Sequence, residues 1–200
     1  MVNGFDFSDK NSGMDWDKLS NFSQSFAYLK ASEGLSITDK TFNVNRASAK
    51  EHGWLVGAYH WLDPKLNCQK QAEKFALTIG STRGELPPAV CLDLYRSATS
   101  EMDRNVRLFV DTLIELMGRK VVIYTSSVYW QSYLPKSEWA DRCLLWIDLP
   151  GSIFPPQIYP WAGWTFWQTS FKAIMPGING IVGVNWFNGS VKELQQLVNG

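Results

Sequence analysis

Short apolar runs rich in β-branched and aromatic residues recur along the whole chain, separated by polar residues, glycine or proline. Runs of about four to eight such residues predict β-strands. These runs lie at residues 3–8, 25–32, 54–61, 88–95, 120–126, 143–149, 163–170 and 180–187. The pattern therefore predicts eight strands.

Segments with helical periodicity lie between the earlier strands. The clearest is 100–118, in which Val106, Phe109 and Leu113 belong to a broad apolar face and Gly118 provides a stop. After residue 126 the helical signal weakens, and the later connections are rich in proline and glycine. Further helices are predicted at 15–22, 41–53 and 67–80, with a short one at 127–134.

Alternation of strands and helices is typical of parallel β/α units. Eight strands favour a closed barrel, with about five β/α units followed by three strands that lack full helices. Because the chain is shorter than the roughly 250 residues of the usual (β/α)₈ barrel, we expect one domain, residues 1–200, folded as an irregular TIM-like (β/α)₅(β)₃ barrel. An open doubly wound sheet is the alternative, but the only candidate phosphate loop, GSTRG at 80–84, follows a helix and not a strand.

The charge balance argues against nucleic acid as a partner. The chain has 19 Lys and Arg against 19 Asp and Glu, without a basic cluster, whereas phosphate binding requires a basic excess on some face. No apolar run approaches the roughly 20 residues that cross a bilayer, and residues 1–10 lack the pattern of a signal peptide. We expect no membrane insertion, and the pattern leaves the oligomeric state open.

The cysteines and histidines suggest neither a disulfide framework nor a metal site. Cys68, Cys91 and Cys143 are odd in number and widely spaced, and the last two lie in strand runs as expected of buried thiols. His52 and His60 are separated by eight positions, and no C-x-x-C motif is present. We therefore expect no metal and no cofactor.

Candidate chemistry gathers where the predicted strands end, which is where β/α barrels place their active sites. Carboxylates beside aromatic rings are typical of a glycan cleft, because acids handle protons or oxocarbenium charge while rings stack on sugars. Core packing is the alternative for each Trp, and a satisfied hydrogen-bonding role is the alternative for His60. The strand-end residues are Asp6, Glu33, Tyr59, His60, Trp61, Asp93, Tyr95, Tyr124, Trp146, Asp148, Trp167, Gln168 and Asn185.

Several motifs, in this order and spacing, resemble the family 25 glycoside hydrolases, the muramidase-type lysozymes. They are GFDFS (4–8), DWDKL (15–19), FAYLKASEG (26–34), TFNVNRASAKEHGWLVGAYHW (41–61), LPPAVCLDLY (86–95), VVIYTS (121–126), LLWID (144–148), FWQTS (166–170) and VNWFNGS (184–190). The resemblance covers nearly the whole chain. It implies a flattened (β/α)₅(β)₃ barrel and cleavage of peptidoglycan between N-acetylmuramic acid and N-acetylglucosamine.

Two positions depart from the family pattern. The family has Asp-x-Glu after the fourth strand, with Glu as general acid, whereas this chain has Asp93 and Tyr95. Its last strand commonly reads V-D-L-N, and Gly183 stands at that aspartate. Asp6 and Asp93 remain as the candidate catalytic acids.

A tyrosine in place of the acid predicts weak or absent hydrolysis by the usual mechanism. A phenol has a pKa of about 10, and general acid catalysis contributes about 10²–10⁴-fold. Three interpretations remain: a muramidase using another acid, first Asp148 and then Asp9 or Glu33; a domain that binds peptidoglycan or a related glycan without cleaving it; or a structural module of a phage particle or cell surface. We favour a catalytic site that has departed from the family pattern, in which the other strand-end residues bind substrate. We expect the protein to act at the bacterial cell wall, extracellular or phage-associated.

Overall fold

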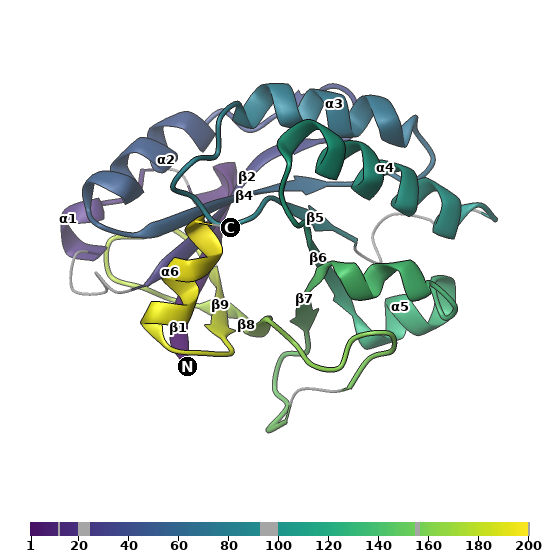
Figure 1. The fold of residues 1–200 in the computed structure, drawn as a ribbon. Coiled ribbons are helices and arrows are strands. Elements are labelled where there is room, and N and C mark those ends of the chain that lie inside the picture. Colours follow the sequence, from purple (N-terminus) through teal and green to yellow (C-terminus); the bar gives the residue numbers. More distant parts are fainter. Residues whose placement is uncertain (12, 20–24, 93–99, 155–156, 200) are drawn as a thin grey trace.

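The computed structural model describes residues 1–11, 13–19, 25–92, 100–154 and 157–199. Eight of its strands follow one another around a closed sheet in the order β1-β9-β8-β7-β6-β5-β4-β2, and β2 pairs with β1 to complete the ring. The predicted TIM-like (β/α)₅(β)₃ barrel is confirmed (Figure 1). The barrel strands are β1 (Val2–Phe7), β2 (Phe26–Glu33), β4 (Leu55–Trp61), β5 (Ala89–Cys91), β6 (Val122–Ser126), β7 (Leu144–Asp148), β8 (Phe166–Ala173) and β9 (Val182–Phe187).

Each predicted strand run overlaps one of these strands, and residues 93–95 of the fourth run lie outside the described residues. Neighbours from β1 through β2 and β4 to β8 pair in parallel. Strand β9 is antiparallel to both β8 and β1. A further short strand, β3 (Ile37–Thr38), folds back on the end of β2. The barrel mouth is the opening at the C-terminal ends of the parallel strands.

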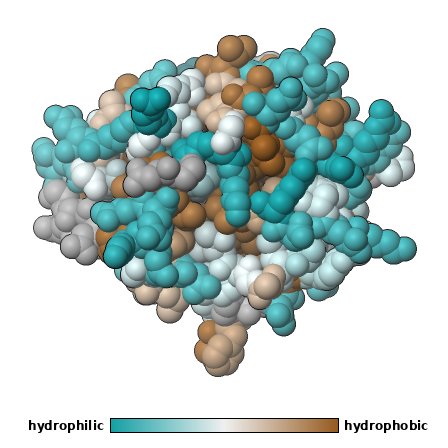
Figure 2. Space-filling view, viewed as in Figure 1, coloured by the Kyte–Doolittle hydropathy of each residue, from teal (hydrophilic) through white to brown (hydrophobic). Residues whose placement is uncertain are grey.

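The helices cover the parallel part of the barrel. Helices α2, α3 and α4 lie side by side along one flank, where parallel connections require crossovers (Figure 1). Hydrophilic side chains cover most of the face in Figure 2, and hydrophobic atoms gather towards its centre. The helices are α1 (Trp16–Leu19), α2 (Phe42–Glu51), α3 (Cys68–Ile79), α4 (Met102–Met117), α5 (Ser127–Tyr133) and α6 (Val191–Asn199), with 3₁₀ turns η1 (Asp9–Asn11) and η3 (Glu138–Arg142).

Helix α6 was not predicted from the sequence. It begins with a capping box, in which Ser190 Oγ accepts from the Glu193 N–H and Glu193 Oε2 accepts from the Ser190 N–H. Leu194 is fully buried in the same apolar cluster as Val2. Arg119 donates to the carbonyl oxygens of Leu197 and Val198. The helix therefore closes the end of the barrel opposite the mouth.

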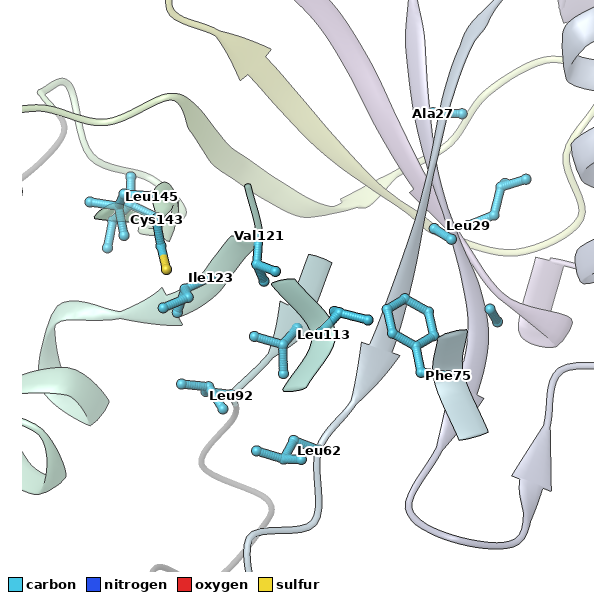
Figure 3. Packing of buried hydrophobic residues seen from close by; sticks show 14 of the residues in the cluster. Ala27, Leu29, Leu62, Phe75, Leu92, Leu113, Val121, Ile123, Cys143 and Leu145 are labelled. Carbon is cyan, nitrogen blue, oxygen red and sulfur yellow. The ribbon is translucent and has the colours of Figure 1, made fainter. Parts of the chain in front are cut away.

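The apolar residues form two separate clusters because side chains alternate along each strand. One cluster fills the barrel and includes Tyr28, Trp146 and Phe166. The other lies between the strands and the helices, where Phe75 of α3 and Leu113 of α4 pack near strand residues (Figure 3). The three cysteines are buried thiols, as expected for Cys91 and Cys143. Within the described ranges, no helix has the length and apolar character to cross a membrane.

A buried ion-pair cluster fastens the loop before β5 to helix α2. Glu85 is 1% exposed, and its two carboxylate oxygens accept from Arg46 Nε at 2.8 Å and Nη2 at 2.9 Å. Lys50 Nζ adds a contact of 2.8 Å. Arg46 also donates to the carbonyl oxygens of Ile79 and Ser81, so one guanidinium joins α2, the end of α3 and the loop.

Substitution of Gly57 by alanine is expected to lower the free energy of unfolding by about 1–3 kcal/mol. A Cβ atom at Gly57 would lie 2.3 Å from the ring of Tyr28, which is fully buried and donates to the Pro87 carbonyl. Urea unfolding followed by tryptophan fluorescence measures the effect. Gly163→Ala is the matched control, because a Cβ there meets nothing within 4 Å. Equal unfolding midpoints for the two variants would contradict this packing.

Candidate functional site at the barrel mouth

Side-chain alternation decides which strand-end residues face the barrel interior and its mouth. Three observations give the orientation of these side chains: which of them belong to the apolar cluster inside the barrel, which of them bond to Asp6, and which of them line the cavity beside Tyr124. Asp93 and Tyr95 lie outside the described residues. The predicted residues that the structure brings together here are Asp6, Tyr59, Trp61, Tyr124, Trp146, Asp148, Gln168 and Asn185.

A hydrogen-bonded network surrounds Asp6, and we call its members, Asp6, Tyr124, Trp146, Gln168 and Asn185, the Asp6 network. Asp6 Oδ1 accepts from Gln168 Nε2 at 2.6 Å and from Asn185 Nδ2 at 2.8 Å. The Tyr124 hydroxyl donates to Gln168 Oε1 at 2.7 Å, and Trp146 Nε1 donates to Asn185 Oδ1 at 2.8 Å. An indole N–H can only donate, so it holds the Asn185 amide with its NH₂ group towards Asp6.

Burial raises the pKa of Asp6, and the hydrogen bonds from Asn185 and Gln168 oppose this shift. Burial also raises the pKa of Tyr59 well above its ordinary value, and the nearby Asp6 carboxylate adds to that shift. Asp6 therefore keeps its proton to higher pH than an exposed aspartate does. A carboxyl group of this kind suits proton transfer better than a fully solvated one.

The Asp6→Asn variant is expected to be more stable than the parent protein at neutral pH, by about 0.5–2 kcal/mol. Because the folded-state pKa of Asp6 is raised, its ionisation favours folding less than protonation does. The stability that protonated Asp6 contributes is fully present below the pKa that Asp6 has in the unfolded protein. This stability is lost as pH rises through the pKa that Asp6 has in the folded protein. The amide oxygen of the substituted side chain can still accept from both neighbouring amides. Urea midpoints measured from pH 3 to 8 test this, and a variant that loses stability at every pH would contradict it.

Gly183 leaves the space into which the Asp6 carboxyl group fits. Gly183 is opposite Asp6 in the β1–β9 register. A Cβ atom on Gly183 would lie 1.9 Å from Asp6 Oδ1 and 2.5 Å from Gln168 Nε2, which are distances that real Cβ contacts do not show. The observed position of Asp6 therefore requires glycine at 183.

Glu33 lies at the end of β2 and forms an ion pair with Lys30, with Nζ and Oε2 2.6 Å apart. Both side chains are largely buried, and the Lys30 ammonium lies 5.1 Å from the centroid of the Trp61 ring. Among the described residues, no hydrogen-bond acceptor lies within reach of the buried Trp61 Nε1. This side of the mouth thus combines a cation, an acid and an indole donor.

Asp148 borders a cavity of about 220 Å³ between the ends of β6 and β7. The register places Asp148 beside Gln168 and Ser126. Ser126 and Ser127 were not recognised as site residues from the sequence, although alternation from Tyr124 indicates that Ser126 points the same way. The lining residues are Leu92, Tyr124, Ser126, Ser127, Val128, Asp148, Leu149 and Pro150.

Two predicted site residues point away from the mouth. His60 is fully buried between β4 and the helices, where its ring contacts Ser32 Oγ and Gln71 Oε1 and lies against Phe109. Burial lowers the pKa of His60 to about 3, so the ring is neutral. Trp167 packs in the outer cluster and donates to the Leu149 carbonyl. The expectation that these two side chains reach the mouth is not met. His60 follows inward-facing Tyr59 and Trp167 precedes inward-facing Gln168, so alternation along the strand turns both side chains outward.

The described ranges contain no group of three His, Cys, Asp or Glu side chains that could hold a metal ion. The described side chains at the mouth supply carboxyl, amide, hydroxyl, ammonium and aromatic groups. Such groups can bind sugar hydroxyl and acetamido groups and can exchange protons with them.

Comparison with known proteins identifies a matching family, similar sequences and a similar solved structure. The sequence profile of glycosyl hydrolases family 25 matches residues 5–178. Lysozyme M1 of Streptomyces globisporus is 31% identical over 99% of this chain and 71% of its own length, and the uncharacterized protein YegX of Escherichia coli (strain K12) is 28% identical over 100% and 74%. The crystal structure of the bacterial lysozyme from Streptomyces coelicolor superposes with a TM-score of 0.92 at 30% identity, covering 99% of this chain and 97% of that one.

Proposed function

The chain belongs to glycosyl hydrolase family 25, and from that premise we propose that its barrel mouth binds peptidoglycan or a related glycan. The observation that carries the proposal is the Asp6 network, a carboxyl group held by two amides at the mouth of a barrel. Tyr59 and Trp61 of β4 add aromatic rings on the interior face of the barrel, and Trp61 Nε1 is a buried donor. Buried donors without a partner are uncommon in folded proteins, and a bound glycan would supply an acceptor for this one.

Asp6 and Asp93 are the acids of the proposed site, and Tyr95 stands where the family motif has the general acid. Tyr95 cannot deliver a proton to a glycosidic oxygen at neutral pH with the efficiency of a carboxylic acid, because a phenol is several pKa units weaker. Hydrolysis by the usual route is therefore weak or absent in this proposal. Residues 1–200 act as one domain at the bacterial cell wall, extracellular or phage-associated.

A second candidate, residual cleavage with Asp148 as the acid, is favoured by one observation. Asp148 lines the cavity at the ends of β6 and β7 together with the Tyr124 hydroxyl of the Asp6 network. A carboxyl group at the edge of a cavity can reach a glycan bound there and can serve as its proton donor.

Binding and cleavage of purified cell walls distinguish these functions. We expect the protein to sediment with insoluble peptidoglycan, Asp6→Ala to bind much more weakly, and dye release from labelled walls to be slow. Fast dye release that Asp148→Asn abolishes supports the second candidate. Fast release that Asp148→Asn leaves unchanged contradicts the proposal that hydrolysis by the usual route is weak or absent. A protein that neither sediments with walls nor releases dye contradicts glycan binding and supports the structural-module alternative.

A further inference from the structure

We infer that Gly183 is a positioning residue for Asp6: by carrying no side chain, it lets the Asp6 carboxyl group lie against β9 where both amides donate to it. The inference deepens the proposed glycan site and rests on it for its effect on binding. Its structural part concerns only the fit between positions 6 and 183 and can be tested without any glycan.

The geometry leaves the Asp6 side chain little freedom. Asp6 and Gly183 are register partners on antiparallel strands, so their side chains point to the same side of the sheet. The space that a Cβ atom would fill at 183 is already occupied by Asp6 Oδ1, at 1.9 Å, and by Asp6 Cγ, at 2.5 Å. Any larger residue at 183 must displace the carboxyl group.

Displacement of Asp6 would also break up the amide pair. Gln168 Nε2 lies 2.5 Å from the same Cβ position, so a side chain at 183 presses on donor and acceptor together. The Gln168 and Asn185 amides cannot simply follow Asp6, because Tyr124 and Trp146 hold their oxygen atoms. A side chain at 183 would therefore separate Asp6 from its donors.

An acid restored at 183 would not rebuild the family motif in this chain. Gly183→Asp would put a second carboxyl group into the space that Asp6 uses, and like charges at such a distance disfavour the ionisation of both. The mouth is arranged for one amide-held carboxyl group on the β1–β9 side.

A double-mutant cycle tests the inference with Gly183→Ala, Asp6→Ala and the combined variant. We expect Gly183→Ala to lower the urea midpoint strongly in the parent protein and less in the Asp6→Ala background, because removal of the carboxyl group relieves the clash with Asp6 and leaves only the contact with Gln168 Nε2. Gly163→Ala, with open space around it, should cost the same in both backgrounds. If Gly183→Ala lowers stability by the same amount in the parent protein and in the Asp6→Ala background, the inference is overturned. If Gly183→Ala alone does not fold, a folded double variant gives the same support, and an unfolded double variant overturns the inference.

Sedimentation with peptidoglycan supplies the functional arm. Gly183→Ala should weaken binding by about tenfold in the parent protein and leave the residual binding of Asp6→Ala unchanged. Equal weakening in both backgrounds would contradict a role through Asp6. If the parent protein binds no peptidoglycan, the proposed function fails, while the unfolding cycle still decides whether Gly183 positions Asp6.

Discussion

The Tyr95→Glu variant is expected to release dye from labelled cell walls about 10²-fold faster than the parent protein, or more. General acid catalysis contributes about 10²–10⁴-fold, and a glutamic acid, with an ordinary pKa of about 4.3, is a far stronger proton donor than a phenol with a pKa of about 10. The substitution returns the Asp-x-Glu motif at 93–95, with Asp6 still held by the two amides. Initial rates of dye release at pH 5–7 measure the gain.

The control for this variant adds the same charge elsewhere. Tyr133→Glu places a carboxylate on α5 at a side chain that is 41% exposed, and it should leave the rate unchanged. Addition of Asp93→Asn to Tyr95→Glu should remove the gain, because the second acid of the motif is lost. A Tyr95→Glu protein that folds, sediments with walls and remains as slow as the parent would show that the missing acid is not what limits cleavage.

The Glu85→Gln variant is expected to lose about 3 kcal/mol of unfolding free energy, near the lower end for removal of one partner from a buried ion pair. The lower end applies because Arg46 is 18% exposed and Lys50 is 46% exposed. The glutamine NH₂ group would face an Arg46 N–H in place of a carboxylate oxygen. Thermal and urea unfolding at pH 7 measure the loss.

Glu101→Gln is the matched control, since the Glu101 side chain is 58% exposed and its Arg104 partner is 77% exposed. Exposed pairs contribute about 0–1 kcal/mol, so this variant should remain close to the parent. Similar small losses for Glu85→Gln and Glu101→Gln would mean that the cluster around Arg46 contributes no more than a surface contact does.

Much of the fold could be predicted from the sequence because its signals are local. Runs with strand composition and helical periodicity recur at the lengths a barrel requires, and Gly118 takes the left-handed conformation that ends α4. Helix α6 was missed although Ser190 and Glu193 form the S-x-x-E pattern of a capping box. The short strand β3 has too few residues to give a pattern.

The residues of the candidate site could be predicted only where the alternation of side chains along each strand was taken into account. On β4, inward Tyr59 and Trp61 require His60 to face the helices, and on β8 inward Gln168 requires Trp167 to face outward. Strand ends alone indicate which residues lie near the mouth and leave open which of two neighbours faces it.

Other features depend on contacts between distant parts of the chain. Glu85 meets Arg46 across 39 positions, and Gly183 makes room for a carboxyl group at position 6. No periodicity or motif links such residues, because their proximity follows from barrel closure. The sequence showed that Gly183 departs from the family motif, and only the folded arrangement explains what the departure allows.

Helix α6 and the beginning of β1 lie close together at the closed end of the barrel (Figure 1), so the first and last described residues lie away from the mouth that holds the Asp6 network. A bead, a fluorescent tag or a carrier protein joined to either terminus would therefore hold the domain with its barrel mouth outward. Immobilised in this way, the protein should capture wall fragments as well as it does when free in solution.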